Sequence, residues 1–203
     1  MVPGRHLFRR LRYGRPIIIV SGLPRSGTSM AMRMLEAGGL EIVTDRARPA
    51  DDDNPYGYFE YDHVLSLDKG EDQGWLAGAR GKAVKVVSAL LPHLPERYQY
   101  RVIFMHRDLR EVLVSQNKML ERRGGAGGTA GDDEMVRIYE GHLARVTALL
   151  RRRRCFETLD VRYADVLADP AGQARRIHQF LGGGLDAARM AEAVSPDLYR
   201  NRR

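Results

Sequence analysis

The stretch VSGLPRSGTSM, Val20–Met30, limits what this chain can fold into more than any other part of the sequence. The apolar, β-branched run Ile17–Val20 leads into it and predicts a buried strand. Residues 28–37 predict a helix, because the pair of glycines after them is a common helix stop. Between the two, Gly22 and Gly27 allow a tight turn and a close approach of the backbone to a ligand. This order of strand, loop and helix predicts a site for phosphate or sulfate, since helix N-termini favour anions.

The cation of this loop is not where a nucleotide-triphosphate loop has it. Such loops read G-x-x-x-x-G-K-[ST], and Thr28 stands here in the place of the lysine. The nearest cation is Arg25, whose planar guanidinium is always charged and suits oxyanions. Thr28 and Ser29 add hydroxyl donors. Because the lysine of phosphoryl-transfer loops works beside a Mg²⁺ ion, its loss favours an anion carried by a nucleotide without a metal.

The rest of the chain alternates between strands and helices. The pattern predicts further strands at 82–89, 100–106 and 155–161, and helices at 58–68, 108–123, 133–153, 163–170, 171–182 and 186–194. This alternation predicts an α/β fold of the P-loop type, a three-layer sandwich with a central parallel sheet and helices on both faces. Ligands of such sheets bind beyond the carboxyl ends of the strands, where the loop after Val20 must lie.

The chain length suits one domain, 1–203, with a basic N-terminal arm at 1–14 and a flexible glycine-rich connector at 124–132. The net charge of +7 favours anionic partners, but no aromatic residues interleave with the basic ones as nucleic-acid platforms require. The longest aliphatic run, Ile17–Val20, is too short to cross a membrane, and no secretory signal is apparent. Cys155 is the only cysteine, which excludes an internal disulfide and fits a cytoplasmic location.

The helix predicted at 108–123 carries polar residues of interest at its start. Asp108 is its natural N-cap, with Glu111 three residues on as in a capping box, and its buried stripe is predicted to be Leu109, Val112, Leu113 and Leu120. Arg107 ends the preceding strand and therefore lies at the ligand edge. Ser115 is two helical turns beyond the cap on one face.

These motifs together resemble the sulfotransferases, which transfer the sulfuryl group of 3′-phosphoadenosine 5′-phosphosulfate (PAPS). Their 5′-phosphosulfate loop reads P-[KR]-S-G-T-[ST], and residues 24–29, PRSGTS, match it throughout, with the arginine that resembles the tyrosylprotein and bacterial branches. Their second signature is a strand, an arginine and a serine eight residues on, which hold the 3′-phosphate; Arg107 and Ser115 match it. Residues 161–182 are similar to a third family segment, in which the tyrosine at position 163 lies near the adenine.

The resemblance implies PAPS as cosubstrate, 3′-phosphoadenosine 5′-phosphate (PAP) as product, and no metal. It implies cofactor binding by Arg25, Ser26, Gly27, Thr28, Ser29, Arg107, Ser115 and Tyr163. The alternative for Tyr163 is that it is a residue of the hydrophobic core with no part in cofactor binding.

Two family motifs are missing. There is no C-terminal R-K-G-x-x-G loop, for which the basic tail LYRNRR is a possible substitute, and no K-T-H-[LM]-P histidine. The second motif keeps only Lys85, with Val87 where the histidine would be. Lys85 is expected either to reach the transferring group, together with Arg25 as a catalytic cation, or to be a surface lysine on an edge strand.

Without that histidine, a carboxylate is the expected general base. Glu60 is preferred, because Tyr58, Phe59 and Tyr61 surround it in sequence and their bulk could desolvate it. The weaker candidates are Asp45, Glu41, Asp62 and His63.

The function predicted from the sequence is metal-independent, in-line sulfuryl transfer from PAPS to a hydroxyl or amine of a small-molecule or peptide acceptor. The alternatives are a P-loop small-molecule kinase, with Asp108 as its metal-binding acid, and a non-catalytic nucleotide- or nucleic-acid-binding protein. The sequence does not indicate which acceptor is used or whether the chain forms oligomers.

Overall fold

The computed structural model of the chain describes residues 14–45, 57–70, 73–122 and 131–194. The predicted N-terminal arm up to residue 13, most of the glycine-rich connector and the basic tail lie outside the described residues. Two connector positions are described, and one of them, Asp132, is the first residue of a helix.

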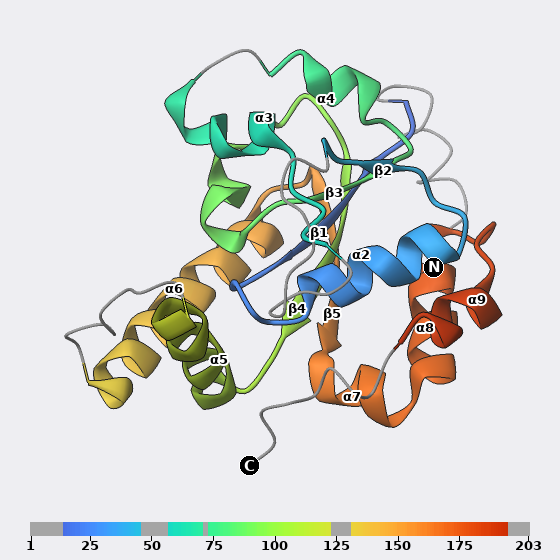
Figure 1. Cartoon of the computed structure of the whole chain (residues 1–203). Coiled ribbons are helices and arrows are strands. Elements are labelled where there is room, and N and C mark those ends of the chain that lie inside the picture. Colours follow the sequence, from blue (N-terminus) through green and yellow to red (C-terminus); the bar gives the residue numbers. More distant parts are fainter. Residues whose placement is uncertain (1–13, 46–56, 71–72, 123–130, 195–203) are drawn as a thin grey trace.

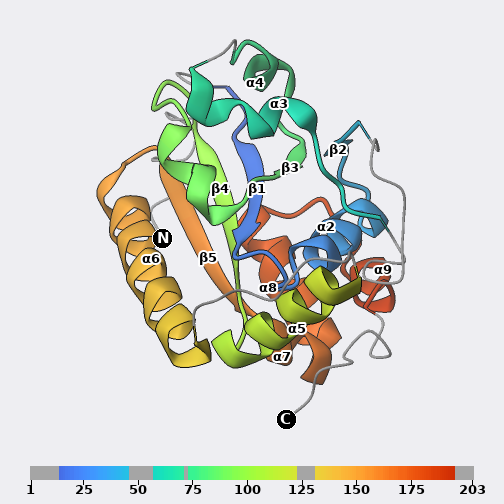
Figure 2. The ribbon, with the colours of Figure 1, turned by 60° about the vertical axis from the view of Figure 1, so that its left-hand side comes forward.

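A five-stranded sheet, with every strand parallel to its neighbours, forms the centre of the molecule (Figure 1). The strand order is β2-β3-β1-β4-β5. The strands are β1 (Ile17–Gly22), β2 (Ile42–Val43), β3 (Ala83–Lys85), β4 (Tyr100–His106) and β5 (Phe156–Arg162). Helices cover both faces of this sheet (Figure 2), so the predicted α/β sandwich is confirmed.

The two faces bury alternate residues of the central strands, as the two-residue period of a strand requires. Ile18 and Val20 belong to one buried cluster, and Ile17 and Ile19 to the other. The first cluster packs under α2 (Thr28–Ala37), α7 (Tyr163–Ala168), α8 (Pro170–Leu181) and α9 (Ala187–Glu192). The second packs under α3 (Asp62–Leu65), η1 (Leu67–Lys69), α4 (Trp75–Gly78), η2 (Ser88–His93) and α6 (Asp132–Arg152).

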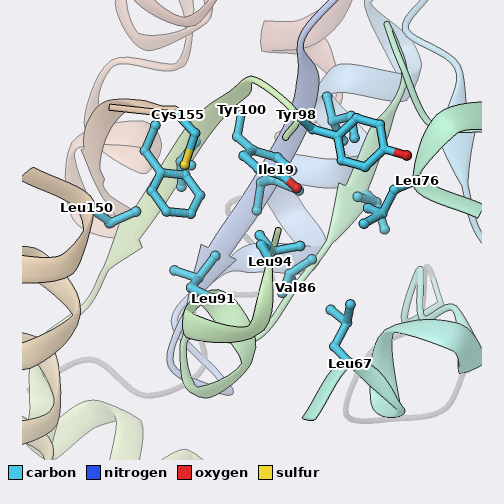
Figure 3. Close-up of a cluster of buried hydrophobic side chains, with 14 of the residues drawn as sticks. Ile19, Leu67, Leu76, Val86, Leu91, Leu94, Tyr98, Tyr100, Leu150 and Cys155 are labelled. Carbon is cyan, nitrogen blue, oxygen red and sulfur yellow. The ribbon is translucent and has the colours of Figure 1, made fainter. Parts of the chain in front are cut away.

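The second cluster is shown in Figure 3, and several short segments contribute to it together with the long helix α6. Leu67, Leu76, Leu91 and Leu94 cover one part of the sheet, and all are almost fully buried. Tyr100 is 1% exposed, and its hydroxyl donates to the carbonyl of Pro95 (2.9 Å), which satisfies the buried phenol. This packing fixes the segment between β3 and β4, and with it the carboxyl end of β3.

Several predicted boundaries were wrong. The strand predicted at 82–89 ends at Lys85, because Ser88–His93 turns into the 3₁₀ helix η2. The helix predicted at 58–68 is two short turns, α3 and η1, and the two-residue strand β2 was not predicted. In α5 (Leu109–Arg122), Leu120 is 37% exposed, so it is not part of the buried stripe, whereas the polar Ser115 is buried.

No helix in the described part of the chain has the length and apolar character needed to cross a membrane.

Candidate active site

The binding loop and two further predicted site residues meet at one edge of the sheet because their strands are parallel neighbours. β1 ends at Gly22, which is in register with Met105 of β4. On the other side of β1, Val20 is in register with Lys85, the last residue of β3. The loop 23–27, Lys85 and Arg107 therefore all follow carboxyl ends of adjacent strands, where α/β sheets bind ligands.

The loop needs glycine at both of its glycine positions. A Cβ atom on Gly22 would lie 2.6 Å from the carbonyl oxygen of Met105, and one on Gly27 would lie 2.5 Å from the ring of Tyr163. Gly27 also has a φ of 98°, a conformation that residues with side chains rarely adopt. The close packing of the loop against β4 and Tyr163 thus explains the glycine spacing.

Arg25 has a positive φ of 71° although it is not glycine. Its Nε donates to Ser115 Oγ (2.9 Å), ninety residues away in sequence, and its carbonyl accepts from Arg107 Nη1 (3.2 Å). Ser115 is 3% exposed. The loop arginine and the two residues of the second predicted motif therefore form one hydrogen-bonded cluster.

Arg107 is enclosed from three directions. Its Nε donates to Glu111 Oε2 (2.9 Å), and both side chains are about nine-tenths buried, at 8% and 11% exposure. Its guanidinium lies 4.5 Å from the centre of the Tyr163 ring, within cation–π range. Burial raises the pKa of Tyr163 above its ordinary value, against a lowering influence of Arg107. Tyr163 is thus buried, as the core reading expected, but its ring packs against the loop and Arg107.

Glu111 also belongs to the site, although the sequence predicted only a helix-capping role for it. The predicted cap is confirmed, because Asp108 Oδ1 accepts from the backbone N–H groups of Arg110 (3.0 Å) and Glu111 (3.1 Å). The Glu111 carboxylate, however, pairs with Arg107. The sequence contained one signal for this pair, because an acid four residues after an arginine can reach it across one helical turn.

The start of α2 has the features of an anion site. Its N-cap is Gly27, and within the described chain no side chain caps this end, so first-turn amides face the loop. Ser26 is 2% exposed, and its hydroxyl has no hydrogen-bond partner among the described residues. Thr28 and Ser29 lie in the same first turn. An orphaned buried hydroxyl beside an uncapped helix start fits the phosphosulfate group that the motif implies.

Lys85 and Glu60 face each other at the end of β3. Lys85 Nζ donates to the carbonyl of Tyr58 and lies 3.8 Å from Glu60 Oε1. The Lys85 side chain is only 9% exposed, and β3 has β2 on one side and β1 on the other. The alternative of a surface lysine on an edge strand is therefore wrong.

The expected enclosure of Glu60 by aromatic rings is also wrong. The Glu60 side chain keeps 37% exposure. Tyr58 and Phe59 are buried in the protein, and the Tyr61 ring packs edge-on against Trp75 (5.2 Å between centres). The aromatic residues around Glu60 in sequence thus point elsewhere.

The weaker acid candidates are all exposed. Glu41 pairs with Lys82, and Asp45 Oδ2 accepts from the backbone N–H of Asp62 (2.7 Å). His63 packs beside Tyr61 on the exposed turn α3. In the described part of the chain, no group of three or more His, Cys, Asp or Glu side chains could hold a metal ion.

Comparison with known proteins agrees with these motifs. A family model described as a sulfotransferase family matches residues 82–186, which is more than half of the chain. The chain belongs to the sulfotransferase family. The match begins at residue 82, so the assignment of the loop at 22–29 rests on its own sequence and geometry. No curated protein matches the chain by sequence.

Solved sulfotransferase structures share the fold at low identity. Sulfotransferase STF1 from Mycobacterium tuberculosis superposes with a TM-score of 0.62 and 19% identity, over 94% of this chain and 73% of that one. Mouse sulfotransferase SULT7A1, complexed with PAP, superposes with a TM-score of 0.56 and 17% identity, over 88% of this chain and 62% of that one. A retinol dehydratase bound to retinol and PAP superposes with a TM-score of 0.53 and 17% identity, over 95% of this chain and 69% of that one. At these identities the likeness concerns the fold.

Proposed function

We propose that the chain is a PAPS-dependent sulfotransferase that moves the sulfuryl group to a hydroxyl or amine of a small-molecule or peptide acceptor. One observation carries the proposal: Arg25, Ser115 and Arg107, from two separate motifs, form a single cluster at the carboxyl edge of the sheet. Related structures that contain PAP, among them the mouse sulfotransferase and the retinol dehydratase, support the same cosubstrate. The arginine in the loop relates the chain to the bacterial and tyrosylprotein branches.

The proposed binding roles follow the two charged ends of the nucleotide. The loop 24–29 and the uncapped start of α2 bind the 5′-phosphosulfate through backbone amides and the hydroxyls of Ser26, Thr28 and Ser29. Arg107 and Ser115 bind the 3′-phosphate, and the ring of Tyr163 lies near the adenine. Bound PAPS supplies an activated sulfuryl group with a phosphate as its leaving group.

The proposed catalytic residues are Arg25, Lys85 and Glu60. Arg25 and Lys85 are cations at the carboxyl edge of the sheet, where charge would develop on the transferring group. Fixed cations in a site partly shielded from water stabilise such charge. Two roles fit Glu60, namely taking the proton of the acceptor or holding the Lys85 ammonium in place. Because Glu60→Gln cannot take a proton, an unchanged transfer rate in this variant would exclude the first role.

Calorimetry with PAP in the absence of Mg²⁺ tests the proposal. Arg25→Ala and Arg107→Ala should each bind PAP about tenfold or more weakly, because hydrogen bonds to charged groups contribute about 1.5–3 kcal/mol. Arg176→Ala is the matched control, because Arg176 is exposed on α8 and its removal changes the net charge equally. Wild-type affinity in both site variants would refute the binding assignment.

The same experiment separates the alternatives. ATP binding that requires Mg²⁺ would support a kinase, and steeply salt-dependent oligonucleotide binding would support a nucleic-acid-binding protein. Labelled PAPS offered with panels of small-molecule and peptide acceptors would then identify the acceptor class. We expect the enzyme to work in the cytoplasm.

A further inference from the structure

A second polar contact lies at the same edge of the sheet, outside the binding loop. Ser88 opens η2, three residues after Lys85, and is only 1% exposed. Its Oγ lies 2.8 Å from Nε2 of His142, which comes from α6. A buried hydroxyl thus holds one nitrogen of an imidazole that reaches across from another element.

The face of α6 that carries His142 also reaches the binding loop. Tyr139 lies one helical turn before His142 and therefore on the same face. Its hydroxyl donates to Gln116 Oε1 (2.6 Å), and Gln116 Nε2 in turn donates to the carbonyl of Pro24 (3.4 Å). His142 therefore bonds to a serine that lies three residues beyond Lys85 in sequence, and Tyr139, one helical turn away, contacts the loop through Gln116.

The imidazole is in the charge state that a proton acceptor needs. Burial lowers the pKa of His142 below its ordinary value, and the positive charge of Arg145 on the same helix lowers it further. The neighbours from η2 and α5, Ser88 and Gln116, are neutral. β5 packs against α6 near Leu150, where the two share the apolar cluster of Figure 3. His142 is therefore neutral at pH 7 and able to accept a proton.

We propose that His142 takes the proton from the attacking hydroxyl or amine of the acceptor, with Ser88 as the residue that positions its ring. The inference rests on the proposed sulfuryl transfer. The acceptor O–H or N–H bond breaks and its proton goes to Nδ1 of the imidazole, whose Nε2–H donates to Ser88 Oγ in this tautomer. The electron pair that it leaves forms the new bond to sulfur. The old S–O bond breaks, and its electron pair leaves with the phosphate of PAP. His142 then releases the proton to water. Glu60 takes the second of its two roles and holds Lys85.

Three variants test this assignment. His142→Gln keeps a side chain that can bond to Ser88 but cannot accept a proton, and Ser88→Ala keeps the imidazole but removes its anchor. His178→Gln is the control, because His178 lies on α8, on the opposite face of the sheet, where its Nδ1 donates to the Leu185 carbonyl (2.8 Å). Each variant is first checked for PAP binding by calorimetry, which should stay within twofold of the wild type.

The first readout is the titration of the histidine rings by NMR, with and without PAP. Phosphate charge near His142 should raise its pKa when PAP binds, and His178 should not respond. Ser88→Ala should change the His142 titration as well. If PAP binds and the His142 titration does not move, His142 is not beside the reacting group and the inference is refuted.

The second readout is cleavage of labelled PAPS with water as the acceptor, which needs no knowledge of the natural acceptor. His142→Gln should slow release of sulfate about 100-fold or more, as for loss of a general base, while Glu60→Gln should slow it less. Wild-type cleavage in His142→Gln would overturn the inference and leave the proposed function standing. If the wild-type chain does not bind PAP at all, the proposed function and the inference fail together.

Discussion

Replacing Arg25 by glycine or by alanine should separate what its side chain does from what its backbone costs. Both variants lose the guanidinium and its bond to Ser115, so they lose the same contacts. They differ in one atom, the Cβ. At the positive φ of 71° found here, a residue with a Cβ costs about 1–2 kcal/mol that glycine avoids.

The magnitudes can be worked from these contacts. Loss of a hydrogen bond from a charged group costs about 1.5–3 kcal/mol, which Arg25→Ala should show in full. Arg25→Gly avoids about 1–2 kcal/mol of backbone strain in the folded state. Glycine also makes the unfolded chain more flexible, which lowers the free energy of unfolding by about 0.4–1 kcal/mol. The glycine variant should therefore be the more stable of the two by about 1 kcal/mol, or about 2–4 °C in Tm for a domain of this size.

Thermal unfolding and PAP calorimetry on the same two proteins complete the test. PAP affinity should fall about tenfold or more in both variants, and equally, because neither carries a cation in the loop. Strain held at a binding position is typical of functional sites. If Arg25→Gly is less stable than Arg25→Ala, the strain argument is wrong. If the two bind PAP with different affinities, the backbone as well as the guanidinium contributes to binding.

Three further predictions follow from the site. Gly27→Ala should lower Tm by about 4 °C or more, because backbone strain adds to the clash with Tyr163, whereas Gly39→Ala, with a φ of 90° but open space around it, should show the strain alone. Because burial raises the pKa of Tyr163, wild-type stability should be full below about pH 10 and fall as pH rises through the folded value, and Tyr163→Phe should reduce this alkaline loss in urea unfolding, while the buried Tyr100, whose pKa is also raised, should maintain the remainder. Because burial lowers the pKa of His142, the unfolded chain binds a proton there more readily, so stability should fall as pH drops below about 6.5; an equally steep acid limb in His142→Gln would contradict this.

The sequence predicted best those features that depend on local pattern. The strand, loop and helix around Gly22 and Gly27 follow from β-branching and glycine spacing, and the cap at Asp108 follows from its position before an apolar helix. These features depend on residues that are close in sequence, so their physical cause is visible there.

The contacts that complete the site could not be predicted, because they join distant residues. Arg25 meets Ser115 across 90 residues, and Ser88 meets His142 across 54. Aromatic neighbours in sequence suggested a buried Glu60. Tyr58 and Phe59 are instead buried in the core, and the Glu60 carboxylate stays partly exposed. Which side of a backbone faces the core in an irregular segment depends on packing against the sheet, and a short segment has no period that reveals it.

The pairing of Arg107 with Glu111 changes how a phosphate dianion must enter this site. An arginine with only water around it would gain the full charge-assisted interaction with a phosphate, but Arg107 already donates to a carboxylate and to the Arg25 carbonyl, and it packs on Tyr163. On the proposed assignment, binding of a 3′-phosphate would be an exchange of partners, and its free energy would be the difference between the old and new contacts. The same pairing holds Arg107 in place before the ligand arrives, so less conformational entropy is lost on binding. In the proposed site, Glu111 would thus lower the affinity that Arg107 could provide and at the same time fix its orientation, which would favour release of the nucleotide product after transfer.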